Sequence, residues 1–146
     1  MASTSIHRVA FFGSDTFYRR VFRAGAIWNL AGGAFITAAT RWIFATAGIP
    51  PPSPPMYYQS WIALFIVFGF GYYLVARDLD RNRDIALLGG IGKLAFAAIF
   101  LYHYVASPGQ APAFFWIPLI GDVVFAVLFL KFYAQRARTE KAMAAR

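Results

Sequence analysis

The chain has 146 residues, of which 60% are hydrophobic and 14% are charged, and its formal net charge is +8. A water-soluble domain of this length has too much surface for so few charged side chains to cover, so the composition excludes an ordinary soluble fold and predicts a single membrane domain. The absence of cysteine excludes disulfides, thiolate chemistry and cysteine-ligated metals. The basic residues form short clusters between apolar segments, which argues against nucleic-acid binding.

Four apolar segments are long enough to cross a lipid bilayer, whose core of about 30 Å requires about 20 residues of helix. Lipid offers no hydrogen-bond partner to the backbone, so segments of this length must be helical. The segments are 22–40, 57–76, 85–105 and 114–133. We therefore predict an all-α fold, a transmembrane antiparallel four-helix bundle with short loops. Residues 1–21 and 134–146 are expected to form an N-terminal tail and a basic C-terminal tail.

The distribution of lysine and arginine predicts the orientation. Basic residues cluster before the first segment, between the second and third, and after the fourth, whereas the other two connections contain only Arg41. Cytoplasmic loops carry an excess of lysine and arginine, so both termini are expected in the cytoplasm. The clustered residues are Arg8, Arg19, Arg20, Arg23, Arg77, Arg81, Arg83, Lys131, Arg136, Arg138, Lys141 and Arg146.

The connection after the first segment, 48–55, is rich in proline, which lacks a backbone donor and favours an extended chain. We interpret it as a rigid, non-helical spacer on the outer face, in preference to a ligand for an aromatic groove. Residues 107–112 are predicted to form the second outer turn.

The connection between the second and third segments, 77–84, alternates acidic and basic residues. The main interpretation is a solvated turn whose charges pair with one another. A site for a lipid head group or a partner, formed by Arg77, Asp78 and Arg81, is the alternative. Asp84 is expected to cap the third helix, since its carboxylate can accept hydrogen bonds from exposed N–H groups.

Two charged residues lie inside apolar segments, Lys93 in the third and Asp122 in the fourth. Each lies about 12 Å from the start of its own helix, which in antiparallel helices places the two at similar depth. A lone charge near the bilayer centre costs at least about 2.5–3.5 kcal/mol, so the two are expected to pair. Side chains lean toward the N-terminus of their helix, so these two lean apart. We therefore expect water or Asn29 to bridge them.

Small residues accompany these polar groups and would allow the helices to approach closely. On the first and third segments they form two faces that are expected to point inward: Gly25, Asn29, Gly32 and Gly33, and Gly89, Gly90, Lys93 and Ala97. The cluster of Asn29, Lys93 and Asp122 is either a site for a polar ligand or a proton, or a structural contact that fixes helix register.

Neither a metal site nor a cofactor is predicted. The two histidines, His7 and His103, are far apart in the expected topology, and no haem-binding or catalytic motif occurs. The many aromatic residues, including Tyr72 and Tyr73, are interpreted as packing and lipid contacts. No catalytic residue is assigned.

Several motifs together resemble a family of uncharacterised bacterial four-helix membrane proteins, and the chain is distantly similar to the DoxX-like superfamily. The resemblance spans 22–133, and its motifs are Trp28-Asn29, the segment 71–78, Asn82-Arg83, Gly92-Lys93 and Gly121-Asp122. It implies an antiparallel four-helix bundle in the bacterial inner membrane, with no established reaction.

Three classes of function are compatible with these features. The first is a non-enzymatic module that binds a small apolar or amphipathic molecule, or a partner membrane protein, in contact with membrane lipids. The second is a small transporter or proton-coupled carrier that uses Lys93 and Asp122 and works as a homo-oligomer. The third is an intramembrane enzyme for a lipid or quinone-like substrate, with Asp122 as acid or base. Four helices leave little room for an alternating-access pathway, and few titratable groups lie in the segments, so the first class is preferred.

Overall fold

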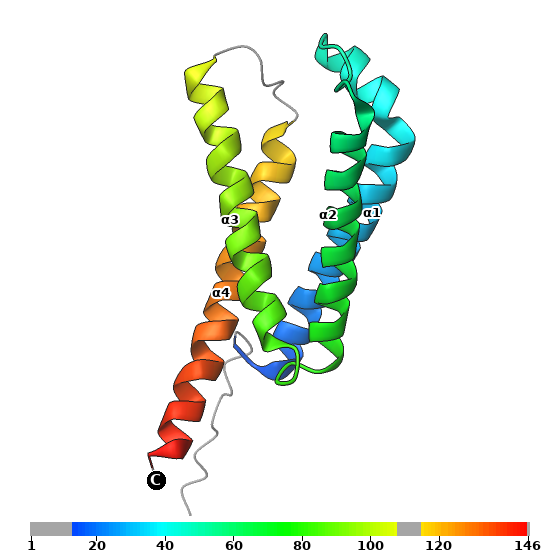
Figure 1. Cartoon of the computed structure of the whole chain (residues 1–146). Coiled ribbons are helices and arrows are strands. Elements are labelled where there is room, and N and C mark those ends of the chain that lie inside the picture. Colours follow the sequence, from blue (N-terminus) through cyan, green and yellow to red (C-terminus); the bar gives the residue numbers. More distant parts are fainter. Residues whose placement is uncertain (1–12, 108–114, 146) are drawn as a thin grey trace, which may run out of the picture.

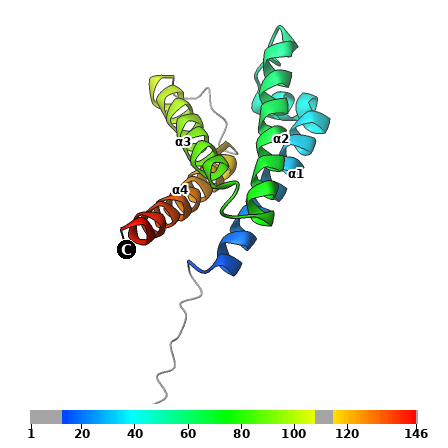
Figure 2. The same ribbon diagram turned by 60° about the horizontal axis from the view of Figure 1, so that its bottom comes forward.

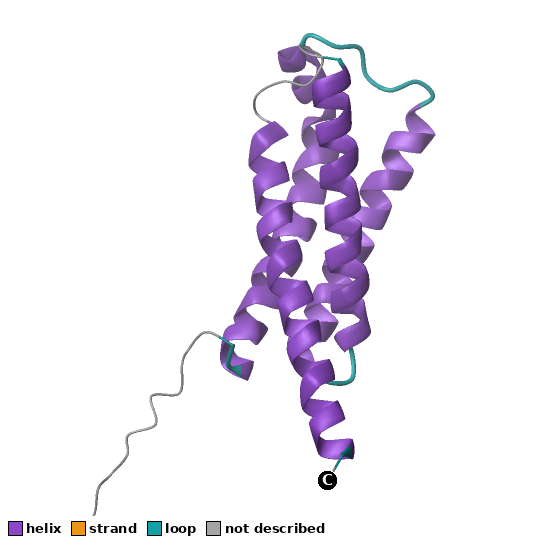
Figure 3. Ribbon diagram, turned by 90° about the vertical axis from the view of Figure 1, so that its left-hand side faces the viewer, coloured by secondary structure: helices purple, strands orange, loops and turns teal. Residues whose placement is uncertain are grey.

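The computed structural model describes residues 13–107 and 115–145. This part of the chain contains four helices, and Figure 3 shows how loops connect them. Their bounds are α1 (Asp15–Ala47), α2 (Pro55–Arg77), α3 (Arg83–Ala106) and α4 (Trp116–Ala144). The predicted all-α class is confirmed. The expected turn at 107–112 lies, apart from Ser107, outside the described residues.

Three of these helices, α2, α3 and α4, are long and apolar enough to cross a membrane. The 33-residue helix α1 does not reach the same mean hydropathy, because glycine, threonine, Asn29 and Arg41 interrupt its apolar residues. The predicted membrane character is thus supported for three of the four expected segments.

The helices extend beyond the apolar segments from which they were predicted. Helix α1 begins at Asp15, inside the expected tail, because the Ser14 hydroxyl accepts a hydrogen bond from the Phe17 N–H at 3.2 Å and caps the first turn. Helix α4 continues through most of the expected C-terminal tail (Figure 3). Pro55, expected in the spacer, is the first residue of α2, where its missing N–H breaks no helical hydrogen bond.

The four helices associate as two pairs. Helix α1 packs along α2, and α3 packs along α4, with less contact between the pairs. Figures 1 and 2 show that the pairs lie close together at the end that carries the α2–α3 turn and diverge toward the opposite end. Glycine permits the close packing within a pair: a Cβ added at Gly90 would lie 2.7 Å from the Leu130 side chain.

A buried aromatic core fills the end at which the pairs meet. The rings of Phe22 and Phe129 stack with centroids 4.5 Å apart, and Tyr72 lies 4.7 Å from Phe129. We call residues 15–28, 70–90 and 123–133 the packed half, and residues 30–47, 55–68, 94–106 and 116–121 the open half. The core cluster belongs to the packed half and consists of Tyr18, Val21, Phe22, Ala26, Tyr72, Val75, Ala76, Leu79, Ala86, Phe129 and Phe132.

Ion pairs and hydrogen bonds close the packed half at its polar end. Arg136 of α4 pairs with Asp15 at 2.6 Å and with Asp80 at 3.3 Å. The Tyr18 hydroxyl donates to Gln135 at 2.8 Å. Burial raises the pKa of Tyr18, against the opposing effect of the nearby Arg136 charge. These contacts explain why α4 stays helical beyond its apolar segment.

The α2–α3 turn differs from the expectation of a self-paired loop. Asp78 does fold back on the turn, since its carboxylate accepts from the N–H groups of Asp80 at 3.2 Å and Arg81 at 3.0 Å. The stronger ion pairs, however, join this region to α4, including the pair between Arg83 and Glu140. The turn is therefore anchored to α4 rather than paired only with itself.

The predicted cap of the third helix is also wrong. Asn82 is the N-cap of α3, and it makes no side-chain capping hydrogen bond. Its amide instead donates to the backbone oxygens of Leu74 at 3.0 Å and Asp78 at 3.3 Å. Asp84 lies within the first turn of the helix, where its charge still opposes the helix dipole.

Candidate functional site

Each predicted polar residue lies on the buried face of its helix. Asn29 is 1% exposed, and Lys93 and Asp122 are each 5% exposed. The small residues predicted to share these faces are buried with them: Gly25 and Gly33 on α1, and Gly89, Gly90 and Ala97 on α3. Gly32 is half-buried. The prediction of inward-facing stripes is confirmed, and the missing side chains make room for the polar groups.

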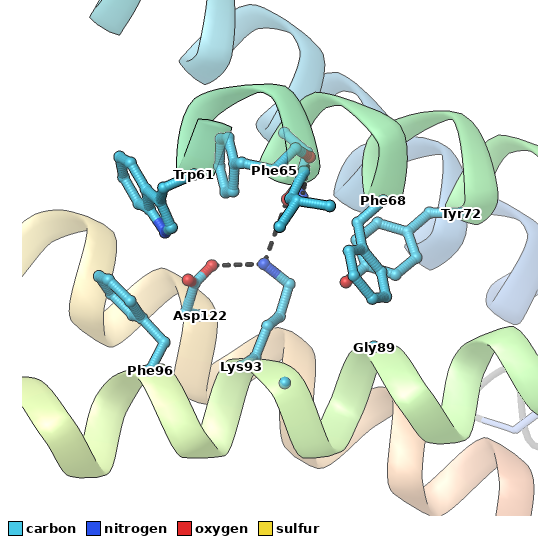
Figure 4. A pocket seen from close by; sticks show the side chains of 11 residues that line it. Trp61, Phe65, Phe68, Tyr72, Gly89, Lys93, Phe96 and Asp122 are labelled. Carbon is cyan, nitrogen blue, oxygen red and sulfur yellow. Dashed lines mark hydrogen bonds and ion pairs between the residues drawn. The ribbon is translucent and has the colours of Figure 1, made fainter. Parts of the chain in front are cut away.

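The structure brings the three polar residues into direct contact, and we call them the polar cluster. Lys93 Nζ lies 2.5 Å from Asp122 Oδ1 and 3.2 Å from Asn29 Oδ1 (Figure 4). The expectation that the charged groups would need a bridge was wrong, because the long lysine side chain spans the offset between α3 and α4. Asn29 binds the ammonium group beside Asp122 rather than between the two charges.

Two further hydrogen bonds hold the polar cluster in place. The Asn29 amide donates to the backbone oxygen of Phe65 at 2.9 Å. The Trp28 indole N–H donates to Asp122 Oδ1 at 3.2 Å. Gly121 makes this second bond possible, since a Cβ at that position would lie 2.6 Å from the Trp28 ring. Trp28 was not predicted as a site residue, although it stands next to Asn29 in a motif of the resemblance.

Three aromatic rings surround the lysine ammonium group. Lys93 Nζ lies 5.8 Å from the ring centroid of Phe65 and 5.7 Å from those of Tyr72 and Phe125. At such distances the negative face of a ring can attract a cation, and the attraction is larger where water is excluded. Tyr72 was expected only to pack or contact lipid, whereas it forms part of this site.

A cavity of about 160 Å³ lies beside the polar cluster, between α2 and α3 (Figure 4). Its walls are mainly aromatic and aliphatic, and Leu64, Phe68 and Gly92 at its edge are exposed at the surface of the molecule. The cavity therefore opens sideways between two helices. The lining residues are Asn29, Trp61, Leu64, Phe65, Phe68, Tyr72, Gly89, Gly92, Lys93, Phe96 and Asp122.

The polar cluster keeps hydrogen-bonding capacity for a further molecule. Lys93 has three N–H donors, and Asn29 and Asp122 accept two of them. Within the described residues, both hydrogen bonds to the Asp122 carboxylate reach Oδ1, which leaves Oδ2 available. The wall of the cavity also includes Tyr72, whose hydroxyl can donate. A small polar group in the cavity would thus meet both donors and an acceptor.

The other predicted candidates do not belong to this site. Arg77, Asp78 and Arg81 lie at the end of α2 and in the following turn, and none of them lines the cavity. Among residues 13–107 and 115–145, no group of three or more histidine, cysteine, aspartate or glutamate side chains could hold a metal ion.

No family model, no curated protein and no solved structure matches the chain. The polar cluster and its cavity are therefore the features that bear on function.

Proposed function

We propose that this protein is a non-enzymatic module of the bacterial inner membrane that binds a small amphipathic molecule between α2 and α3. In this proposal α1 to α4 form an antiparallel transmembrane bundle with both termini in the cytoplasm. The bound molecule enters from the surrounding lipid. Its polar group reaches the polar cluster, and its apolar part lies in the lateral opening.

The exposed surface supports a location in lipid. Large apolar side chains point outward along the three most apolar helices, for example Val67, Ile99 and Val124. Such a surface would be unfavourable in water over so large an area, whereas lipid accommodates it.

Internal hydrogen bonds support α1 as the fourth membrane span despite its lower hydropathy. The Thr37 hydroxyl donates to the backbone oxygen of Gly33 at 2.8 Å, and that of Thr40 donates to Ile36 at 2.7 Å. Asn29 is likewise satisfied inside the protein. These polar groups therefore do not require water.

The charge distribution supports the orientation. The polar end of the packed half carries the ion pairs of Arg83 and Arg136 and most of the arginines and lysines. Exposed Trp42 and Tyr57 lie at the opposite end, near the proline-rich connection. Basic residues favour the cytoplasmic side, and aromatic residues favour membrane interfaces.

The observation that carries the binding proposal is a cavity that joins a buried polar cluster to an opening on the outer surface of the helices. A contact serving only helix register needs no such space. A transporter or an enzyme would need further polar or titratable groups along a path or around a substrate, and this cavity is lined by one ion pair, one asparagine and mainly apolar residues.

Native mass spectrometry of the protein, gently extracted from its host membrane, would test the proposal. We expect the wild-type chain to retain a small amphipathic molecule. Gly92→Leu should lose that molecule, because a Cβ at Gly92 meets no atom within 4 Å and a longer side chain can fill the cavity. Ala95→Leu is the matched control, since Ala95 is exposed on the same helix outside the cavity lining.

Equal retention by the two variants would contradict binding in this cavity. A wild-type protein that carries no small molecule and takes up none from added membrane extracts would contradict the proposed function as a whole. The same spectra report any second copy or partner subunit.

A further inference from the structure

We infer that the molecule bound in this cavity has an electrically neutral polar head with an oxygen acceptor, such as an alcohol or a carbonyl group, attached to an apolar tail. This inference rests on the proposed function and specifies the class of ligand. It follows from the charge balance of the polar cluster, the size of the cavity and the donors that remain at its base.

The charge balance disfavours both anionic and cationic heads. Lys93 and Asp122 are in direct contact at 2.5 Å and are almost completely buried, so their charges cancel within the site. An anionic head that approaches Lys93 would also meet the Asp122 carboxylate, and a cationic head that approaches Asp122 would meet the ammonium group. Each charged head would lose its own hydration without gaining an unopposed partner.

The volume of the cavity limits the size of the ligand's polar head. A dry cavity of about 150 Å³ in a soluble protein holds one benzene molecule. The cavity beside Lys93 has a similar volume, about 160 Å³. It therefore admits a group no larger than about one six-membered ring, and the rest of the ligand must extend through the opening. Phospholipid head groups with their several phosphate oxygens are too large and carry a charge.

The remaining hydrogen-bonding groups favour an acceptor oxygen. Asn29 and Asp122 do not use the third N–H of Lys93, and Tyr72, which also lines the cavity, supplies a hydroxyl (Figure 4). Both groups can donate to a carbonyl or hydroxyl oxygen. A hydroxyl head could donate in turn to Asp122 Oδ2, which would satisfy every polar atom of the head.

The apolar rings beside the opening suit the tail. Trp61 stacks with Phe96 at 6.1 Å and with Phe65 at 5.9 Å, which gives the wall a continuous aromatic surface. Exposed Leu64 and Phe68 extend this surface to the outside of α2. An alkyl or isoprenoid-like chain leaving the cavity would contact these side chains before it enters the lipid.

Photolabelling with three amphiphiles tests the inference. The protein in liposomes is exposed to photoreactive amphiphiles that share one alkyl chain and carry an alcohol, a sulfonate or a primary ammonium head. We expect the alcohol to label peptides of α2 and α3 around the cavity at least about tenfold more efficiently than either charged amphiphile. Gly92→Leu defines the labelling that depends on the cavity, with Ala95→Leu as the matched control.

Charge variants sharpen the test. Asp122→Asn leaves Lys93 without its counter-charge and should shift the preference to the sulfonate, whereas Lys93→Gln should shift it to the ammonium amphiphile. Either shift supports the inference. If these variants do not fold, the wild-type comparison alone still decides it.

The outcomes separate the two proposals. A wild-type preference for a charged head at the cavity would overturn the inference and leave the proposed function standing. A failure of all three amphiphiles to label the cavity, with labelling only of outer lipid-facing positions, would overturn the inference and count against the proposed function as well.

Discussion

The packed half and the open half are built from the same four helices, yet they differ in what lies between the helix pairs. In the packed half, aromatic rings from α1, α2 and α4 fill the space, and Phe22, Phe129 and Phe132 are completely buried. In the open half the pairs diverge (Figures 1 and 2), and a cavity adjoins the buried charges. The polar cluster lies where the two halves meet.

The connections between the helices account for this difference. The short α2–α3 turn joins the two pairs at one end, and its contacts with α4 reinforce that end. The proline-rich connection at the other end joins only α1 to α2, within one pair. The packed half therefore supplies the stability that allows the open half to retain a cavity. The following variants test this division of roles, beginning with the largest expected effect.

Removing one charge at the boundary should destabilise the protein most. Lys93→Met or Asp122→Asn should each lower the free energy of unfolding by about 3–5 kcal/mol, because each leaves an uncompensated buried group. The double variant should recover part of the loss. Equilibrium unfolding in detergent measures all three. Strictly additive losses would show that the two residues do not support each other.

Truncating a large aromatic residue should lower the free energy of unfolding more in the packed half than in the open half. Phe129→Ala should lower the free energy of unfolding in detergent by about 3 kcal/mol. This is the lower end of the range for buried phenylalanine, because apolar detergent tails rather than water surround the unpacked helices. Phe96→Ala is the control, because Phe96 is half-buried and borders the cavity. We expect it to lose about 1 kcal/mol or less. Similar losses for both would remove the distinction between the halves.

Removing the hydrogen bond from Trp28 to Asp122 should lower the free energy of unfolding by a smaller amount. Trp28→Phe keeps most of the ring but removes the donor to Asp122, and hydrogen bonds to charged groups contribute about 1.5–3 kcal/mol. We expect a loss near the lower value, because Lys93 still pairs with the carboxylate. Combining Trp28→Phe with Asp122→Asn should add little to the effect of the second change alone. Full additivity would contradict the role of Trp28 in the polar cluster.

The sequence was sufficient to predict the helices but not their ends. Apolar runs identify α2, α3 and the part of α4 up to residue 133, since lipid requires about 20 apolar residues in a span. The first turns of α1 and the last turns of α4 contain no such run. They are helical because of the Ser14 cap and because Arg136 and Gln135 bond to residues distant in sequence.

The sequence was sufficient to predict the polar residues of the site but not its aromatic residues. Lys93 and Asp122 stand out because charge is rare in an apolar segment. Asn29 was found because its expected depth is close to that of Lys93, and because it lies on the glycine-bearing face of α1. Trp28 and Tyr72 did not stand out, since aromatic residues also occur at lipid-facing positions. Which of them turn inward depends on how each helix is rotated, and packing at Gly121 and Gly89 decides that rotation.

Two glycines of α3, Gly89 and Gly92, test the boundary between the halves most directly. A Cβ at Gly89 would lie 2.8 Å from the Tyr72 hydroxyl oxygen, whereas a Cβ at Gly92 meets nothing within 4 Å. The measurement is the free energy of unfolding of Gly89→Ala and Gly92→Ala in detergent. We predict a loss of about 1–3 kcal/mol for Gly89→Ala through overpacking. Gly92→Ala should cause no loss, or a gain of up to about 1 kcal/mol through higher helix propensity. Equal losses for the two variants would contradict an open cavity beside the polar cluster.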